Sequence, residues 1–72
     1  MSDEAIVKAL CTSAVSHLIG RAMECENISM PDAMKLVYSS KLYQQINDYE
    51  TGLYREGPVY LYGLLNAERG RK

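Results

Sequence analysis

The side chains able to do nucleophilic or acid–base chemistry are few in this chain. His17 is the single histidine, and it shares one predicted helix with both cysteines, Cys11 and Cys25. A nucleophile and a base on one helix must be three or four residues apart to meet. His17 lies six residues after Cys11 and eight before Cys25. The spacing argues against thiol catalysis, and we expect His17 to lie at the edge of the apolar face.

Three carboxylates, Asp48, Glu50 and Glu56, are the second candidate for catalysis. Paired carboxylates can act as acid and base where they converge, but a polar loop is equally explained by solvation. An enzyme would need a pocket lined by His17 or by these carboxylates. The sequence has no glycine-rich phosphate loop, metal-ligand spacing or cofactor motif. We therefore expect no enzyme, no metal site and no cofactor.

Composition predicts one folded domain over residues 1–72. The chain is 47% hydrophobic and 24% charged, which is typical of a globular protein. At this size about 60% of the unfolded surface can be buried, so self-association would add stability. The net charge of −1 gives no general attraction for nucleic acid or anionic membranes. The basic cluster Arg69, Arg71 and Lys72 is interpreted as a frayed, solubilising end.

The two cysteines predict a reducing compartment. At 1.5 Å per helical residue, Cys11 and Cys25 would have their Cα atoms roughly 21 Å apart, whereas a disulfide needs less than about 7 Å. We expect free, semi-buried thiols. Asp3 and Glu4 stand where a secretory signal carries basic residues, and no apolar run reaches transmembrane length. These features predict a cytoplasmic protein.

The first 25 residues predict a central helix. Ser2 is a plausible N-cap, and acidic residues follow it in the first turn. At 100° per residue, an apolar arc emerges that is wider than one partner helix would cover. We therefore expect other segments to contact this helix on two sides. The arc contains Ile6, Val7, Leu10, Cys11, Ala14, Val15, Leu18, Ile19, Ala22 and Cys25.

Small residues form a strip on the opposite side of the same helix: Ala9, Ser13, Ser16 and Gly20. One interpretation is an exposed face with small side chains. The other is a dimer contact, in which the strip meets its symmetry mate. Gly20 costs roughly 1 kcal/mol within a helix, so a compensating contact is expected.

The remaining chain predicts shorter helices. Ser29, followed by Pro31, resembles a capping signal. Ser39 and Ser40 interrupt the next helix, and either hydroxyl could cap a third. Whether residues 30–47 form one bent helix or two stays open.

Turn residues then lead into a closing helix. Thr51-Gly52 marks a turn in which glycine takes a positive φ, and Gly57-Pro58 starts the last helix. No alternation with a period of two residues persists. The predicted fold is an all-α, small orthogonal bundle of three to four helices, at about residues 3–25, 30–38, 40–47 and 58–69.

Tyrosines supply the main functional signal. A tyrosine combines a large apolar body with a hydrogen-bonding tip, and with arginine it is enriched at protein interfaces. The candidate partner-binding residues are Tyr49, Tyr54, Arg55, Tyr60 and Tyr62. The chain has no Phe or Trp, so we expect about half of its tyrosines to be structural.

A DNA-binding regulator is the alternative. Residues 29–46 could form a helix-turn-helix, with Lys41, Gln44 and Gln45 exposed to base edges. A positive face around Lys35, Lys41 and the C-terminus would favour this hypothesis, whereas the net charge of −1 weighs against it.

Residues 28–68 resemble a family of short uncharacterised bacterial proteins of Firmicutes type. The motifs are Tyr38-Ser39-Ser40-Lys41-Leu42-Tyr43, then Glu50-Thr51-Gly52-Leu53-Tyr54, then Pro58 with Tyr60-Leu61 and a closing Glu68. Tyr54 stands where the family commonly has Trp, and Gly57 replaces a Ser. The resemblance implies an accessory or regulatory partner and no catalytic residue. Glu50 and Thr51 could equally lock the loop by bonding its backbone.

These observations predict a small cytoplasmic, non-enzymatic protein-interaction or regulatory module. It would act as a homodimer or as part of a hetero-complex, with no small-molecule substrate indicated.

Overall fold

A computed structural model describes residues 3–70, in which every regular element is helical. The all-α prediction is confirmed, and residues 30–47 form two helices. The elements are α1 (Asp3–Glu26), α2 (Met30–Tyr38), α3 (Lys41–Asn47), the 3-10 turns η1 (Tyr49–Thr51) and η2 (Leu53–Arg55), and α4 (Pro58–Glu68). The predicted N-cap Ser2 and the basic residues Arg71 and Lys72 lie outside the described residues.

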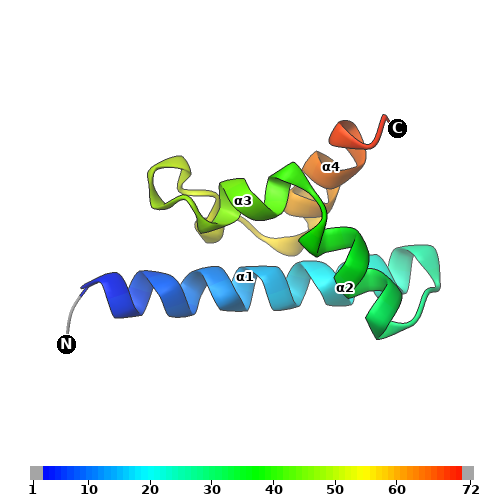
Figure 1. The fold of residues 1–72 in the computed structure, drawn as a ribbon, viewed down its shortest axis with the longest axis horizontal. Helices are drawn as coiled ribbons and strands as arrows, with labels where there is room; N and C mark the ends of the chain where they lie inside the picture. The colour runs from blue at the N-terminus through cyan, green and yellow to red at the C-terminus, as the bar shows by residue number, and fades with distance from the viewer. Residues whose placement is uncertain (1–2, 71–72) are drawn as a thin grey trace.

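Helix α1 is the axis of the fold (Figure 1). Its 24 residues span about 36 Å, close to the molecule's longest extent of 39 Å. Helices α2, α3 and α4 and the turn η2 all contact it. The prediction of a central helix covered from more than one side is therefore confirmed. None of the helices in residues 3–70 combines the length and apolar composition that crossing a membrane requires.

The core is built on the C-terminal two thirds of α1. Its buried members are Cys11, Ala14, Val15, Leu18, Ile19 and Ala22 from α1, with Ala33, Val37, Leu42, Ile46, Leu61 and Leu65 from the other helices. The predicted apolar arc was wrong at both ends. Ile6 and Leu10 are each 46% exposed, and Cys25 is exposed. The short helices that follow α1 do not cover its whole length, so its first two turns project beyond the core.

Local capping explains where the short helices begin. The Ser40 hydroxyl accepts a hydrogen bond from the Tyr43 amide at 3.1 Å, so Ser40 rather than Ser39 caps α3. Ser29 occupies the N-cap position of α2, but its side chain makes no capping bond. Pro31, in the first turn, has no N–H to donate. The helix start was predicted correctly, whereas the capping bond was not.

Backbone bonds lock the loop before α4. The Thr51 hydroxyl lies 2.6 Å from the Gln45 carbonyl and accepts from the Leu53 amide at 3.2 Å. The lock expected of Thr51 is thus present. The Glu50 amide donates to Asp48 Oδ1 at 3.1 Å. Gly52 has a φ of 68°, which glycine adopts without strain.

The last turn of α4 holds two distant parts of the chain. The Glu68 carboxylate accepts from the backbone amides of Lys41 at 2.7 Å and Leu42 at 2.8 Å, so it caps α3. Arg69 pairs with Glu26 at the end of α1, and the Tyr62 hydroxyl donates to the same carboxylate at 2.8 Å. The prediction that Arg69 belongs to a frayed end was therefore wrong, because this ion pair fastens α4 to α1.

Candidate functional site

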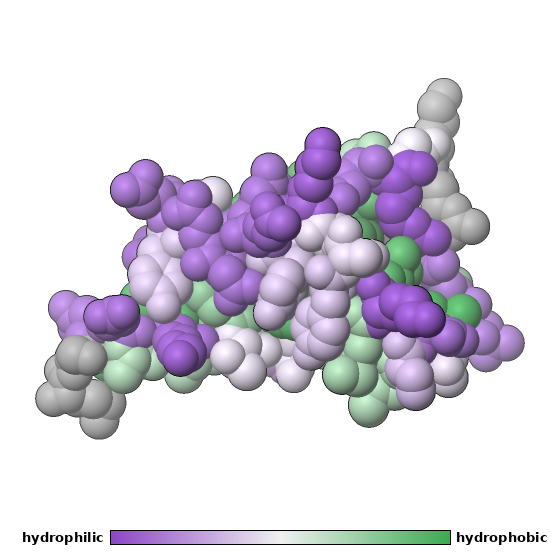
Figure 2. All heavy atoms as spheres, viewed as in Figure 1, coloured by the Kyte–Doolittle hydropathy of each residue, from purple (hydrophilic) through white to green (hydrophobic). Residues whose placement is uncertain are grey.

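The side of α1 that faces away from the core carries the predicted strip of small residues. Ala9, Ser13 and Ser16 are exposed and Gly20 is half-buried. At 100° per residue these four positions fall within an arc of roughly 60°, opposite buried Leu18. Hydrophilic side chains gather over α3 and the turns, whereas paler and green residues follow the α1–α2 edge (Figure 2).

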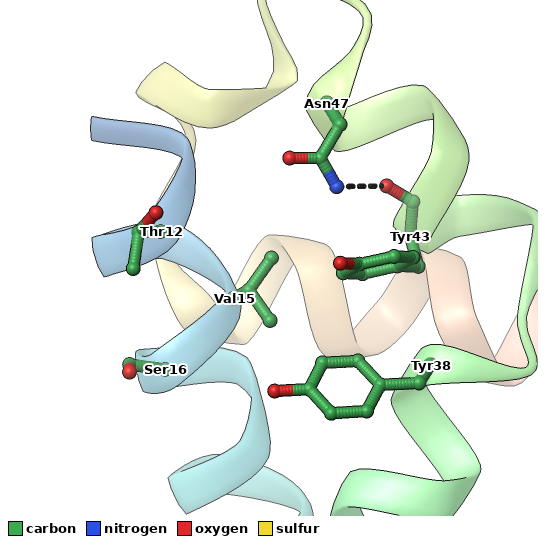
Figure 3. A pocket seen from close by; sticks show the side chains of 6 residues that line it. All are labelled: Thr12, Val15, Ser16, Tyr38, Tyr43 and Asn47. Carbon is green, nitrogen blue, oxygen red and sulfur yellow. Dashed lines mark hydrogen bonds between the residues drawn. The ribbon is translucent and has the colours of Figure 1, made fainter. Parts of the chain in front are cut away.

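A polar hollow of about 110 Å³ lies between α1, α2 and α3 (Figure 3). Its lining residues are Thr12, Val15, Ser16, Tyr38, Tyr43 and Asn47. The two phenol groups point toward α1, and the rings make an edge contact with centroids 5.0 Å apart. The Asn47 amide nitrogen donates to the Tyr43 carbonyl at 2.9 Å. This bond orients the Asn47 side chain at the rim of the hollow.

The chemistry of this hollow is hydrogen bonding without charge. It presents four hydroxyl groups and one carboxamide, and none of its described lining residues is a carboxylate, histidine, cysteine, lysine or arginine. Hydroxyls can donate or accept, so they adapt to either kind of polar group. The hollow therefore suits hydrogen bonds to a peptide or side-chain amide and holds no general base.

A second hollow, of about 240 Å³, lies between α1 and α2 and is largely apolar. Three methionines line it with Ile19, Gly20, Ser16 and Tyr38; the methionines are Met23, Met30 and Met34. Met30 is 55% exposed at its edge. Methionine side chains are flexible and polarisable, so a surface built from them can fit partners of different shape.

The third hollow, of about 320 Å³, lies between α1 and the start of α4. Ser16 and Gly20 again form part of it, and Val59 of α4 lies on the other side with 63% of its surface exposed. Arg21 also lines the hollow, and its Nε atom is buried with no hydrogen-bond partner among the described residues. Because Ser16 and Gly20 belong to both hollows, the small-residue strip is the shared floor of a groove with walls from α2 and α4.

The groups that the sequence analysis weighed and discounted for catalysis do not converge. His17 is exposed on the third hollow, while Cys11 is buried and its thiol donates to the Ile46 carbonyl with a separation of 3.3 Å. Burial raises the pKa of Cys11 above its ordinary value, which disfavours a reactive thiolate. The carboxylates of the loop are exposed. Within residues 3–70, no three His, Cys, Asp or Glu side chains are grouped so that they could hold a metal ion.

The predicted tyrosine set is divided between different parts of the surface. Tyr49 is 40% exposed, and Tyr54 is half-buried against the core with the Arg55 guanidinium 5.5 Å from its ring centre. Tyr60 is 54% exposed, whereas Tyr62 is half-buried and bonded to Glu26. Tyr60 and Tyr62 are two residues apart on α4, which separates them by about 200° around the helix, so they face opposite sides.

Tyr38 and Tyr43 line the groove region instead, and neither was in the predicted partner-binding set. Both lie in the segment Tyr38-Ser39-Ser40-Lys41-Leu42-Tyr43, on which the resemblance to an aromatic-x-Ser-Lys-x-aromatic motif rests. The signal in the sequence that could have indicated this contact is their spacing of five residues across a predicted helix break, because a break there allows the two rings to meet.

The helix-turn-helix candidate is present as two short helices joined at Ser39 and Ser40. Lys41 and Gln44 are exposed. However, the Glu68 carboxylate occupies the N-terminal end of α3. A recognition helix presents this end to DNA, and the carboxylate would repel its phosphates.

Comparison of the chain with models of protein families, with curated proteins and with solved structures finds no match.

Proposed function

We propose that this chain is a small, non-enzymatic interaction module that binds a helical protein segment along the outer groove of α1. The observation that carries the proposal is the shared floor at Ser16 and Gly20, with the largely apolar methionine hollow on one side. On the other side lies a mixed hollow, in which Pro58 and Val59 of α4 face His17, Arg21 and Glu24 of α1. Small floor residues let a second helix backbone approach closely, and helix pairs pack at 8–10 Å between axes. Exposed apolar walls then gain from being covered.

The polar hollow adds hydrogen bonds of defined geometry to such binding. An interface with an apolar centre and a polar edge is common among protein complexes. Here Tyr38 lines both the polar and the methionine hollows, so a bound helix would contact its ring and its hydroxyl together. Tyrosine is among the residues that contribute most when an interface buries them.

Enzymatic and DNA-binding functions have weaker support. The polar hollow has no acid, base or nucleophile of suitable reactivity on its described lining. His17 and Glu24 line the third hollow, but both are exposed side chains of α1, with no described nucleophile other than the Ser16 hydroxyl beside them. DNA binding lacks a net positive charge, because the chain carries −1 overall. A regulatory role in the bacterial cytoplasm agrees with two free cysteines, since disulfides are rare in that compartment.

The test is affinity capture from the native cell extract with tagged wild type and Ser16→Trp, which fills the groove floor. Gln44→Trp, on exposed α3, is the matched control. Circular dichroism melting must show that both variants are folded. We expect proteins, or the untagged chain itself, to be retained by wild type and by the control and lost from Ser16→Trp. An identical set of retained proteins in all three samples would contradict the proposal.

A further inference from the structure

We propose that the helix bound in the groove is α1 of a second copy of this chain, paired antiparallel across a two-fold axis. This inference rests on the proposed function and names its partner. The small-residue strip is symmetric about a point midway between residues 14 and 15. An antiparallel pair centred there sets Ala9 against the partner's Gly20 and Ser13 against the partner's Ser16. Along the strip, small side chains then face small side chains.

The exposed apolar residues of α1 agree with this pairing. Ile6 and Leu10, each 46% exposed, lie at the same side of the strip as His17 and Glu24, because all four fall within roughly 40° around the helix. In an antiparallel pair of identical helices, each flank of the strip on one copy lies next to the same flank on the other copy. Ile6 therefore comes over the partner's Gly20 to Glu24, where the third hollow lies.

The N-terminal part of α1 is exposed and extends toward the position of that hollow in the partner. Among residues 3–10, all are exposed except half-buried Val7, and this part projects beyond the core (Figure 1). The C-terminal part of α1 carries the groove and its walls. Each copy thus contributes one projecting helix end and one groove. The two-fold axis places each end against the groove of the other copy.

The antiparallel orientation also opposes the dipoles of the two copies of α1, which favours it over a parallel pair.

Sedimentation equilibrium of wild type up to about 500 µM is the first test. We expect a dimer, and we expect Ser13→Glu combined with Ser16→Glu to raise its dissociation constant at least about a hundredfold, because four carboxylates would face one another. Gln44→Glu, on exposed α3, is the control and should leave the dimer intact. A wild type that stays monomeric, or a dimer indifferent to the double substitution, overturns the pairing.

Spin labels on native Cys25 test the orientation, because this thiol is exposed and Cys11 is buried. Antiparallel pairing separates the two Cys25 Cα atoms by roughly 32 Å along the axis; parallel pairing in register leaves them about 10 Å apart. A short distance overturns the inference. If wild type is monomeric yet affinity capture still retains another protein through Ser16, the second copy is excluded and the proposed function stands. If capture is also indifferent to Ser16, both fail.

Discussion

Removing the Glu68 carboxylate should destabilise the whole fold through α3. Its two oxygens accept the Lys41 and Leu42 amides at 2.7 and 2.8 Å, donors that the first turn of a helix cannot satisfy internally. Charge-assisted bonds contribute about 1.5–3 kcal/mol each when shielded, but Glu68 is exposed. We therefore expect Glu68→Ala to cost about 1–2 kcal/mol, the range of an N-cap deletion. For a chain of this size the total stability is roughly 4–11 kcal/mol.

Urea denaturation and thermal melting by circular dichroism would measure this loss. The expected fall in melting temperature is about 4–16 °C. Glu56→Ala, at an exposed loop carboxylate, is the matched control and should change the free energy of unfolding by less than about 0.5 kcal/mol. Equal stability of the two variants would refute the reasoning, since it would mean that solvent caps α3 as well as Glu68 does.

Two further predictions concern ionisable groups. Burial, followed by the Glu26 carboxylate, raises the pKa of Tyr62 above 10.0, so the folded state holds this proton more tightly and stability should fall as the pH rises above about 10. Tyr62→Phe should cost about 1.5 kcal/mol at pH 8 and progressively less above pH 10 in urea titrations; a constant difference would count against the assignment. Mass spectrometry after maleimide treatment should show Cys25 modified first and Cys11 slower by about a thousandfold or more, because its burial requires opening of the core; equal rates would contradict that burial.

The helix boundaries followed closely from local signals. Gly57 and Pro58 define the start of α4, and Ser40 caps α3, because these effects depend on residues within one turn. Gly52 likewise takes its expected positive φ. Fold class and element order could therefore be read from sequence, as could the central position of α1.

Burial along α1 could not be predicted to its ends. Ile6 and Leu10 continue the apolar periodicity, so the pattern alone gives no reason to separate them from buried Leu18. Ile6 and Leu10 differ from Leu18 in burial because the chain that follows α1 is too short to cover the whole helix, and it folds back over the C-terminal part. The bonds of Glu68 and Arg69 escape prediction for a related reason. Their partners lie 26 to 43 residues away, and no local pattern encodes such pairing.

The strip on α1 follows from helical periodicity, whereas the hollows beside it do not. Ala9, Ser13 and Ser16 are exposed and Gly20 is half-buried, as both interpretations of the strip allow. The hollows depend on where α2 and α4 cross α1. Tyr38 and Tyr43 were missed because their rings meet only after the chain turns at Ser39 and Ser40. The sequence analysis favoured the segment richest in tyrosines, residues 49–62. In the structure Tyr60 and Tyr62 of that segment face opposite sides of α4.

The closing turn of α4 has a consequence for biosynthesis. Residues 68 and 69 leave the ribosome after the helices that they fasten, yet they complete both the cap of α3 and the fastening of α1. At about 5–20 residues per second, the emerging chain passes several seconds with its first helix made and its core face uncovered. We expect these helices to pack stably only after this turn has emerged, so that a chain stalled or cut before the turn is a substrate for chaperones and proteases.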